Sequence, residues 1–102
     1  MAVTNANLSV SAANIFVSTG NTVISSMHFC NVDATDRTMD LYVVPSGQAI
    51  DATRQIYKTL NIPTLDTYAI TNERLVLGNG DSIAASDSSA DKIVATITYA
   101  SV

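Results

Sequence analysis

Short runs of alternating apolar and polar residues recur along this chain, and they constrain its fold more than any other feature. The clearest run is residues 93–99, in which Ile93, Ala95, Ile97 and Tyr99 fall on one face. Successive side chains of a β-strand point to opposite faces, so a period of two predicts a strand with one buried face. Turn-forming residues separate the runs at intervals of about ten residues. The pattern predicts an all-β fold: an Ig-like antiparallel β-sandwich of seven or eight short strands.

Two neighbouring runs predict a hairpin. Residues 22–31 and 38–44 are both strand-like, and a polar segment of turn-forming residues lies between them. A connection of this length allows the chain to return directly, so we expect the two strands to pair antiparallel. Alternation in the clearest strands also predicts a shared core, whose expected members are Met27, Phe29, Leu41, Val43, Ile83, Ile93 and Ile97.

The segment from residue 48 to residue 62 is less regular. The spacing of small and apolar residues in 48–55 is compatible with a short helical turn. The following run, 56–62, predicts a strand with Ile56, Leu60 and Ile62 facing inward, interrupted by Lys58. Pro63 ends this strand, because proline has no N–H to donate to a neighbouring strand.

Residues 1–18 are expected to form a loose N-terminal arm and a first strand, with residues 19–102 forming the β-sandwich domain. Residues 1–12 are rich in Asn, Ser and Ala, and their apolar residues are too sparse to form a core. Chain ends of this kind stay mobile unless other contacts hold them. We therefore expect the segment to be poorly ordered in the free protein and to extend the sheet of a neighbouring subunit in an assembly.

Composition excludes several classes of protein. The chain has 102 residues, enough for one domain with one core, and only 14% are charged, with a net charge of −4. Five scattered cations form no basic patch, which argues against nucleic-acid binding. No apolar run predicts a membrane span or a signal peptide. The expected protein is made in a cytosol and stays soluble until it assembles. A surface with few charges suits assembly, since few charges lose their water when a partner docks.

His28 and Cys30 are the residues that most resemble a chemical site. They lie two apart, on one face of the same predicted strand. A zinc site needs three or four protein ligands, so Asp33 or Asp40 would have to complete it. A Cys–His nucleophile would need an orienting partner and an oxyanion hole, which no nearby motif supplies. We expect a half-buried strand pair, because free cysteine is commonly buried.

Three further motifs have structural explanations. The segment GNGDS, 78–82, lacks the Lys and the following helix of a phosphate loop, so we expect a tight turn with Asp81 bound to its backbone. Asp87 and Asp91 lack the spacing and the bidentate Glu of a calcium loop, and a mobile polar loop is the expected structure. Glu73 is the single Glu, so a glycosidase carboxylate pair is not expected. The sequence thus predicts no catalytic residue, no cofactor and no metal site.

Carbohydrate binding remains an alternative. β-Sandwiches bind sugars through exposed aromatic side chains, and the chain offers four tyrosines for this role: Tyr42, Tyr57, Tyr68 and Tyr99. The chain has no Trp, and the usual place of Tyr on a sheet is packed with its hydroxyl in water.

Residues 19–102 resemble a group of small virion proteins of tailed bacteriophages. The matching segments are STGNTV (18–23), HFCN (28–31), LYVVPSG (41–47), IYKTLNIP (56–63), LVLGNGDSI (75–83) and a last strand ending near Tyr99. The likeness is a recurring order of strand edges and turns, not a set of catalytic residues. It implies a compact β-sandwich accessory protein of the phage particle.

From the resemblance and the composition together we expect a non-enzymatic virion structural protein, made in the host cytoplasm and located in the virion. Capsid decoration or cementing at subunit junctions is the first expectation, and a neck or tail component or a host-surface glycan-binding module is the alternative. The expected partners are the major capsid protein or neck and tail proteins, and further copies of this chain in a homo-oligomer. Neither nucleic acid nor a membrane is an expected partner.

Overall fold

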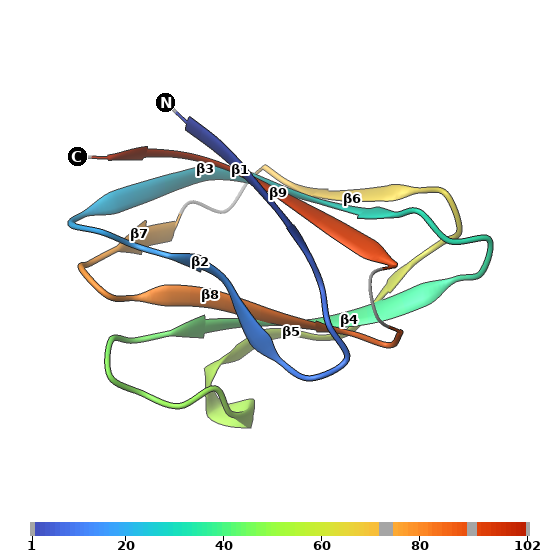
Figure 1. Ribbon diagram of the computed structural model, residues 1–102, viewed down its shortest axis with the longest axis horizontal. Helices are drawn as coiled ribbons and strands as arrows, with labels where there is room; N and C mark the ends of the chain where they lie inside the picture. Colours follow the sequence, from blue (N-terminus) through green and yellow to red (C-terminus); the bar gives the residue numbers. More distant parts are fainter. Residues whose placement is uncertain (1, 72–74, 90–91, 102) are drawn as a thin grey trace.

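The computed structural model describes residues 2–71, 75–89 and 92–101, which fold into nine β-strands and one short 3-10 helix (Figure 1). The described residues contain no α-helix, and the 3-10 helix lies within the segment where the sequence allows a helical turn. The elements are β1 Ala2–Asn7, β2 Ala13–Val17, β3 Thr22–Asn31, β4 Arg37–Val44, η1 Ala52–Arg54, β5 Gln55–Ile62, β6 Thr67–Ile70, β7 Leu75–Leu77, β8 Ser82–Asp87 and β9 Ile93–Ser101.

The strands form two antiparallel sheets that pack face to face, which confirms the predicted all-β sandwich. The first sheet has the order β1-β9-β3-β6. On the side of β3 that faces away from β9, β6 pairs with the second half of β3 and β7 pairs with its first half. The second sheet has the order β2-β8-β4-β5. Strand β1 begins and strand β9 ends at the same end of the sandwich (Figure 1).

The strand order is that of a jelly roll rather than of an Ig domain. Four antiparallel pairings are nested in the sequence: β1 with β9, β2 with β8, β3 with β6 and β7, and β4 with β5. The chain is therefore one long hairpin with its tip between β4 and β5. Rolling this hairpin up places β3 beside β9 and β4 beside β8, which joins the strand pairs into two sheets. Double-sheet jelly rolls built from Greek keys have this arrangement.

The predicted hairpin of residues 22–31 with residues 38–44 is wrong. Strand β3 pairs with β6, β7 and β9, whereas β4 pairs with β5 and β8 in the opposite sheet. Both strands carry one strongly apolar face, and these faces meet across the sandwich: Phe29 and Leu41, both fully buried, belong to the same core. The polar connection thus crosses from one sheet to the other.

Asn31, at the end of β3, organises this crossing. Its side chain is fully buried, and its Nδ2 donates to the carbonyl oxygens of Thr35 at 3.0 Å and of Ile62 at 2.9 Å. Its Oδ1 accepts from the backbone N–H of Asp33 at 2.9 Å. Arg37 Nε donates to Asp33 Oδ2 at 2.7 Å, and this hydrogen bond holds the pKa of the Asp33 carboxyl below its usual value. One buried amide therefore ties the crossing to the end of β5.

Replacing Asn31 with Ala is expected to lower the free energy of unfolding by about 2–3 kcal/mol, because buried backbone groups lose their partners. Urea unfolding of the two proteins measures the difference. Asn61→Ala is the matched control. Asn61 is an exposed residue of β5 next to Ile62, and its substitution should change stability by less than about 0.5 kcal/mol. Equal effects of the two substitutions would contradict this role of Asn31.

The N-terminal segment is part of the sandwich, and the expected loose arm over residues 1–12 is wrong for the residues that the structure describes. Ala2–Asn7 forms β1 and pairs with β9 along all six residues. Leu8 follows with a fully buried side chain in the main core. Ala13–Val17 forms β2 at the edge of the second sheet. Residues 2–17 thus supply one strand to each sheet of the domain.

The core lies between the sheets, and the expected core residues occupy it. Six of the seven are at most 1% exposed, and the seventh, Val43, is half-buried and packs against the others. The alternation of β9 is also confirmed, with Ile93, Ala95 and Ile97 buried.

Two β-bulges explain where alternation in the sequence predicts the wrong side chains to face the core. In β3 the pairing with β9 shifts between Ile24 and Ser26, so that Ile24 and Met27, three residues apart, both face the core. Val23, which regular alternation with Met27 and Phe29 would place inside, is half-buried instead.

In β5 the bulge lies opposite Asp40. Leu41 pairs with Tyr57 and Met39 pairs with Leu60, so two β5 residues oppose one residue of β4. Thr59 takes a positive φ of 53° there, and its N–H donates to Asp40 Oδ1 at 2.7 Å. A bulge reverses the facing of the residues on either side of it. Tyr57 therefore packs against the core and Ile56, expected inside, is 40% exposed.

Candidate functional site

His28 and Cys30 lie on the outer face of the first sheet, as half-buried side chains of β3. Their cross-strand neighbours are Thr96 and Ala69 for His28, and Val94 and Thr67 for Cys30. Neither Asp that would have to complete a zinc site joins them: Asp33 binds Arg37, and Asp40 lies in the other sheet. Within the described residues, no group of three or more His, Cys, Asp or Glu side chains could hold a metal ion. The half-buried strand pair expected from the sequence is what the structure contains.

The GNGDS segment is a tight turn, as expected, and it also ties two other loops to one end of the sandwich. Asp81 Oδ2 accepts from the Gly78 N–H at 2.9 Å within the turn, and Asp81 Oδ1 accepts from the Ser46 N–H at 2.8 Å. Gly80 has a φ of 85°, and a Cβ there would lie 2.4 Å from Ser46 Oγ, so only glycine fits. Asn79 Oδ1 accepts from the Gly20 N–H at 2.9 Å.

Asp87 is a structural residue, and not an exposed cation ligand. Its side chain is 4% exposed. Oδ2 accepts from the N–H groups of Lys92 and Ile93 at 3.2 and 3.0 Å, and Oδ1 accepts from that of Ser89 at 3.1 Å. The carboxylate therefore fixes the start of β9 relative to the end of β8. Asp91, its proposed companion in a calcium site, lies outside the described residues, as does Glu73.

The four tyrosines do not form one exposed patch. Tyr57 and Tyr99 pack against the core, and the Tyr99 ring lies 4.8 Å from that of Phe16. Tyr68 is 37% exposed at the edge strand β6, and its ring meets Tyr57 edge-on at 6.3 Å. Tyr42 lies on β4 in the second sheet, within 3.3 Å of the Gln55 amide. Their placement indicates packing more than a sugar platform.

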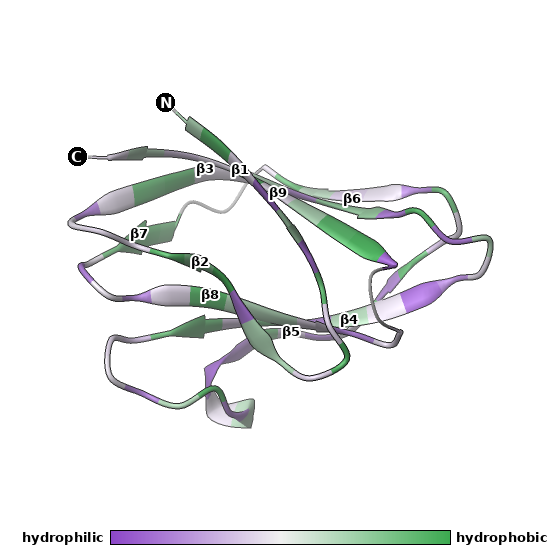
Figure 2. Ribbon diagram, in the orientation of Figure 1, coloured by the Kyte–Doolittle hydropathy of each residue, from purple (hydrophilic) through white to green (hydrophobic). Residues whose placement is uncertain are grey.

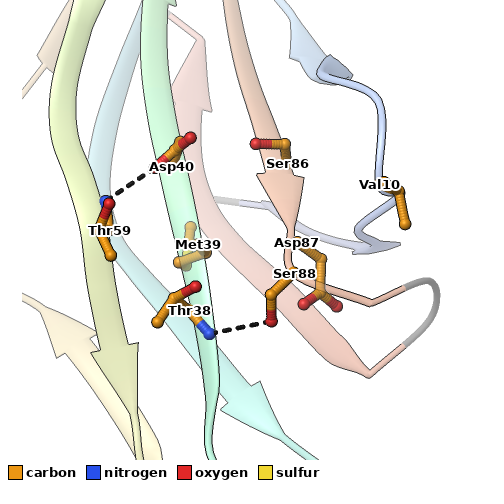
Figure 3. A pocket seen from close by; sticks show the side chains of 8 residues that line it. All are labelled: Val10, Thr38, Met39, Asp40, Thr59, Ser86, Asp87 and Ser88. Carbon is orange, nitrogen blue, oxygen red and sulfur yellow. Dashed lines mark hydrogen bonds between the residues drawn. The ribbon is translucent and has the colours of Figure 1, made fainter.

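A hollow of about 220 Å³ lies on the second sheet, where β4 begins beside the end of β8 (Figure 3). Two of its polar side chains bind the backbone: Asp40 accepts from Thr59 N–H, and Ser88 Oγ accepts from Thr38 N–H at 3.2 Å. Ligand pockets are usually larger, at about 300–1,000 Å³, and mostly apolar. The hollow is therefore smaller and more polar than a usual ligand pocket.

The outer face of the first sheet is the most unusual surface of the molecule. None of its five strands contains an Asp, Glu, Lys or Arg, whereas the second sheet carries Arg37, Asp40, Lys58 and Asp87. In Figure 2 the start of β4 in the second sheet is strongly hydrophilic.

Small and β-branched side chains cover this face in rows that run across the strands. The middle row is Asn5, Thr96, His28 and Ala69, from β1, β9, β3 and β6 in turn. Within it, Thr96 Oγ1 donates to Asn5 Oδ1 at 2.9 Å. The next row is Asn7, Val94, Cys30 and Thr67. We call these two rows, with Val3 and Thr98 beside them, the neutral face. Sequence reasoning missed it, although the absence of charge from these segments is visible in the sequence.

In the described part of the chain no helix is long and apolar enough to cross a membrane. A scan against protein-family models, a search of curated proteins and a search of solved structures each found no match to this chain.

Proposed function

We propose that this chain is a non-enzymatic structural protein of a bacteriophage particle, which decorates or cements the capsid at subunit junctions. Its partners would be the major capsid protein, or neck and tail proteins if it belongs to that part of the virion, together with further copies of itself. The observation that carries the proposal is the neutral face. A surface without Asp, Glu, Lys or Arg can be buried against another protein at little cost in desolvation.

Two further observations support the proposal. The side chains that could do chemistry are used for structure: Asp81, Asp87 and Asn31 all bind backbone groups. Jelly rolls also occur in viral capsid proteins, although lectin domains and cupins share the fold, so the fold alone has little weight. Each copy would hold its neighbours weakly, and many copies on one particle would combine modest affinities into firm attachment.

The test is to compare particles of the phage that encodes this chain with particles grown without the gene. Mass spectrometry is expected to find the chain at many copies in purified particles, and electron microscopy is expected to find the sandwich on the particle surface. Particles that lack it should release DNA at a lower temperature if the protein cements the capsid. Density for the sandwich at the neck or tail would instead identify the chain as a component of that part of the particle.

Particles that contain no copies of the chain would overturn the proposal. A glycan array with the isolated domain serves as the second measurement. We expect no glycan to bind, because the four tyrosines are dispersed. Binding that is lost on Tyr68→Ala would instead favour a host-surface binding module.

A further inference from the structure

Of the strands at the edges of the two sheets, β1 is the one that lacks protection against pairing with another strand. Natural edge strands are usually short, bulged or charged, which prevents edge-to-edge association. Strand β5 carries Lys58 and a bulge, β2 has a bulge between Asn14 and Phe16, and β6 and β7 have only four and three residues. Strand β1 has six residues, with no Pro, no charge and no break in its pairing with β9.

The pairing of β1 with β9 determines which backbone groups face the open edge. The N–H of Leu8 donates to the carbonyl of Ile93 at 3.0 Å, and these residues continue the β1–β9 register by one step. In an antiparallel pair, residues that exchange hydrogen bonds alternate with residues that do not. The even-numbered residues of β1 therefore bond to β9. Val3, Asn5 and Asn7 direct their N–H and C=O groups to the open edge.

We propose that a second copy of this chain pairs with this edge, with the two β1 strands antiparallel about a twofold axis at Asn5. Asn5 then lies opposite Asn5 of the second copy, and Val3 lies opposite Asn7. All three positions have edge-facing N–H and C=O groups, so each pair exchanges two backbone hydrogen bonds. The two first sheets join into one continuous sheet, and their neutral faces lie side by side.

The chemistry of this edge fits a second copy in particular. Near a twofold axis each side chain meets its own equivalent, so a charged residue there would repel itself. The chain carries a net charge of −4, yet β1 and the next two strands of the sheet, β9 and β3, contain no Asp, Glu, Lys or Arg. The side chain on the axis is an amide, which has both a donor and an acceptor and can therefore bond to its own copy.

The contact is small. Stable protein interfaces bury about 800 Å² on each partner, and one six-residue strand pair buries less, so the dimer should be weak and depend on concentration. This inference rests on the fold alone and holds whatever particle the chain joins.

Sedimentation equilibrium from micromolar to millimolar protein tests the proposal. The average mass of the unchanged chain should rise towards twice that of the monomer. Asn5→Lys and Asn5→Asp should each stay monomeric, because two like charges meet at the axis. An equimolar mixture of the two variants should dimerise again, because Lys then faces Asp.

Ala69→Lys is the matched control, since Ala69 is exposed on the same outer face at the opposite edge of the sheet. It should dimerise like the unchanged chain. Asn5→Pro gives a second variant, which removes an edge-facing N–H together with the Asn5 side-chain amide and leaves the backbone bonds to β9 in place. It should also be monomeric, and circular dichroism checks that each variant is folded.

Three results would overturn the proposal. The unchanged chain could remain monomeric over the whole concentration range. Folded Asn5→Lys and Asn5→Pro variants could dimerise as strongly as the unchanged chain. Ala69→Lys could abolish dimerisation while Asn5→Lys does not, which would place the contact on β6.

Discussion

Deleting residues 2–12 is expected to unfold the isolated domain at room temperature or to lower its melting temperature by tens of degrees. The deletion removes β1, and with it every backbone hydrogen bond along one side of β9, as well as the fully buried Leu8. Loss of a buried Leu side chain alone costs about 2–5 kcal/mol. A domain of this size is stable by only about 5–15 kcal/mol in total. Thermal unfolding followed by circular dichroism measures the effect.

Two point substitutions in the full chain serve as controls for this deletion. Leu8→Ala should destabilise by about 2–5 kcal/mol, since a cavity opens in the core. Val10→Ala should change little, because Val10 is 61% exposed. A truncated protein that melts at the temperature of the full chain would show that β1 is dispensable, and the mobile arm suggested by the sequence would then describe the protein in solution.

Replacing Phe29 with Ala is expected to lower the free energy of unfolding by about 3–5 kcal/mol. Phe29 is fully buried near the end of β3, between Ala95 on β9 and Tyr68 on β6. Its ring is one of the largest buried side chains of the core, so the substitution removes much apolar contact and leaves a cavity. Denaturant unfolding gives the number directly.

Val32→Ala is the matched control for Phe29→Ala, since Val32 lies just beyond the end of β3 and is 54% exposed. It should cost less than about 0.5 kcal/mol. A loss below about 1 kcal/mol for Phe29→Ala would mean that β3 presents its other face to the core. Such a result would contradict the pairing register of β3 with β9, and not only the expected free-energy loss at Phe29.

Local features of the sequence were sufficient for the turns and for most of the core. The GNGDS turn depends on the positive φ of Gly80 and on an Asp three residues from Gly78, and both effects act within a few residues of chain. The inward faces of β4 and β9 follow from strict alternation, because side-chain direction in a regular strand has a period of two. The same reasoning failed at Ser25 and Thr59, where a bulge adds one residue without any local change in composition.

For the candidate site, too, sequence reasoning predicted some features and missed others. The sequence alone predicted that His28 and Cys30 are a half-buried strand pair and that Asp81 binds the backbone of a tight turn, and the structure contains both features. The sequence did not indicate the role of Asn31, because the carbonyl of Ile62 that its amide binds is far away in the chain. Nor did it indicate that the uncharged segments would be gathered in one sheet.

What the sequence by itself determined is therefore the type of each element: strands, their apolar faces, the tight turns between them and the low charge of the chain. Only the tertiary structure decided which strands are neighbours. Alternation specifies that a face must be buried but not which other face covers it, so β3 and β4 could satisfy the same pattern as a hairpin or across the sandwich. The pairing of β1 with β9 joins the two ends of the chain, and no local preference can encode it. It arises because adding β1 to the first sheet forms its hydrogen bonds with β9 and also buries Leu8 in the core.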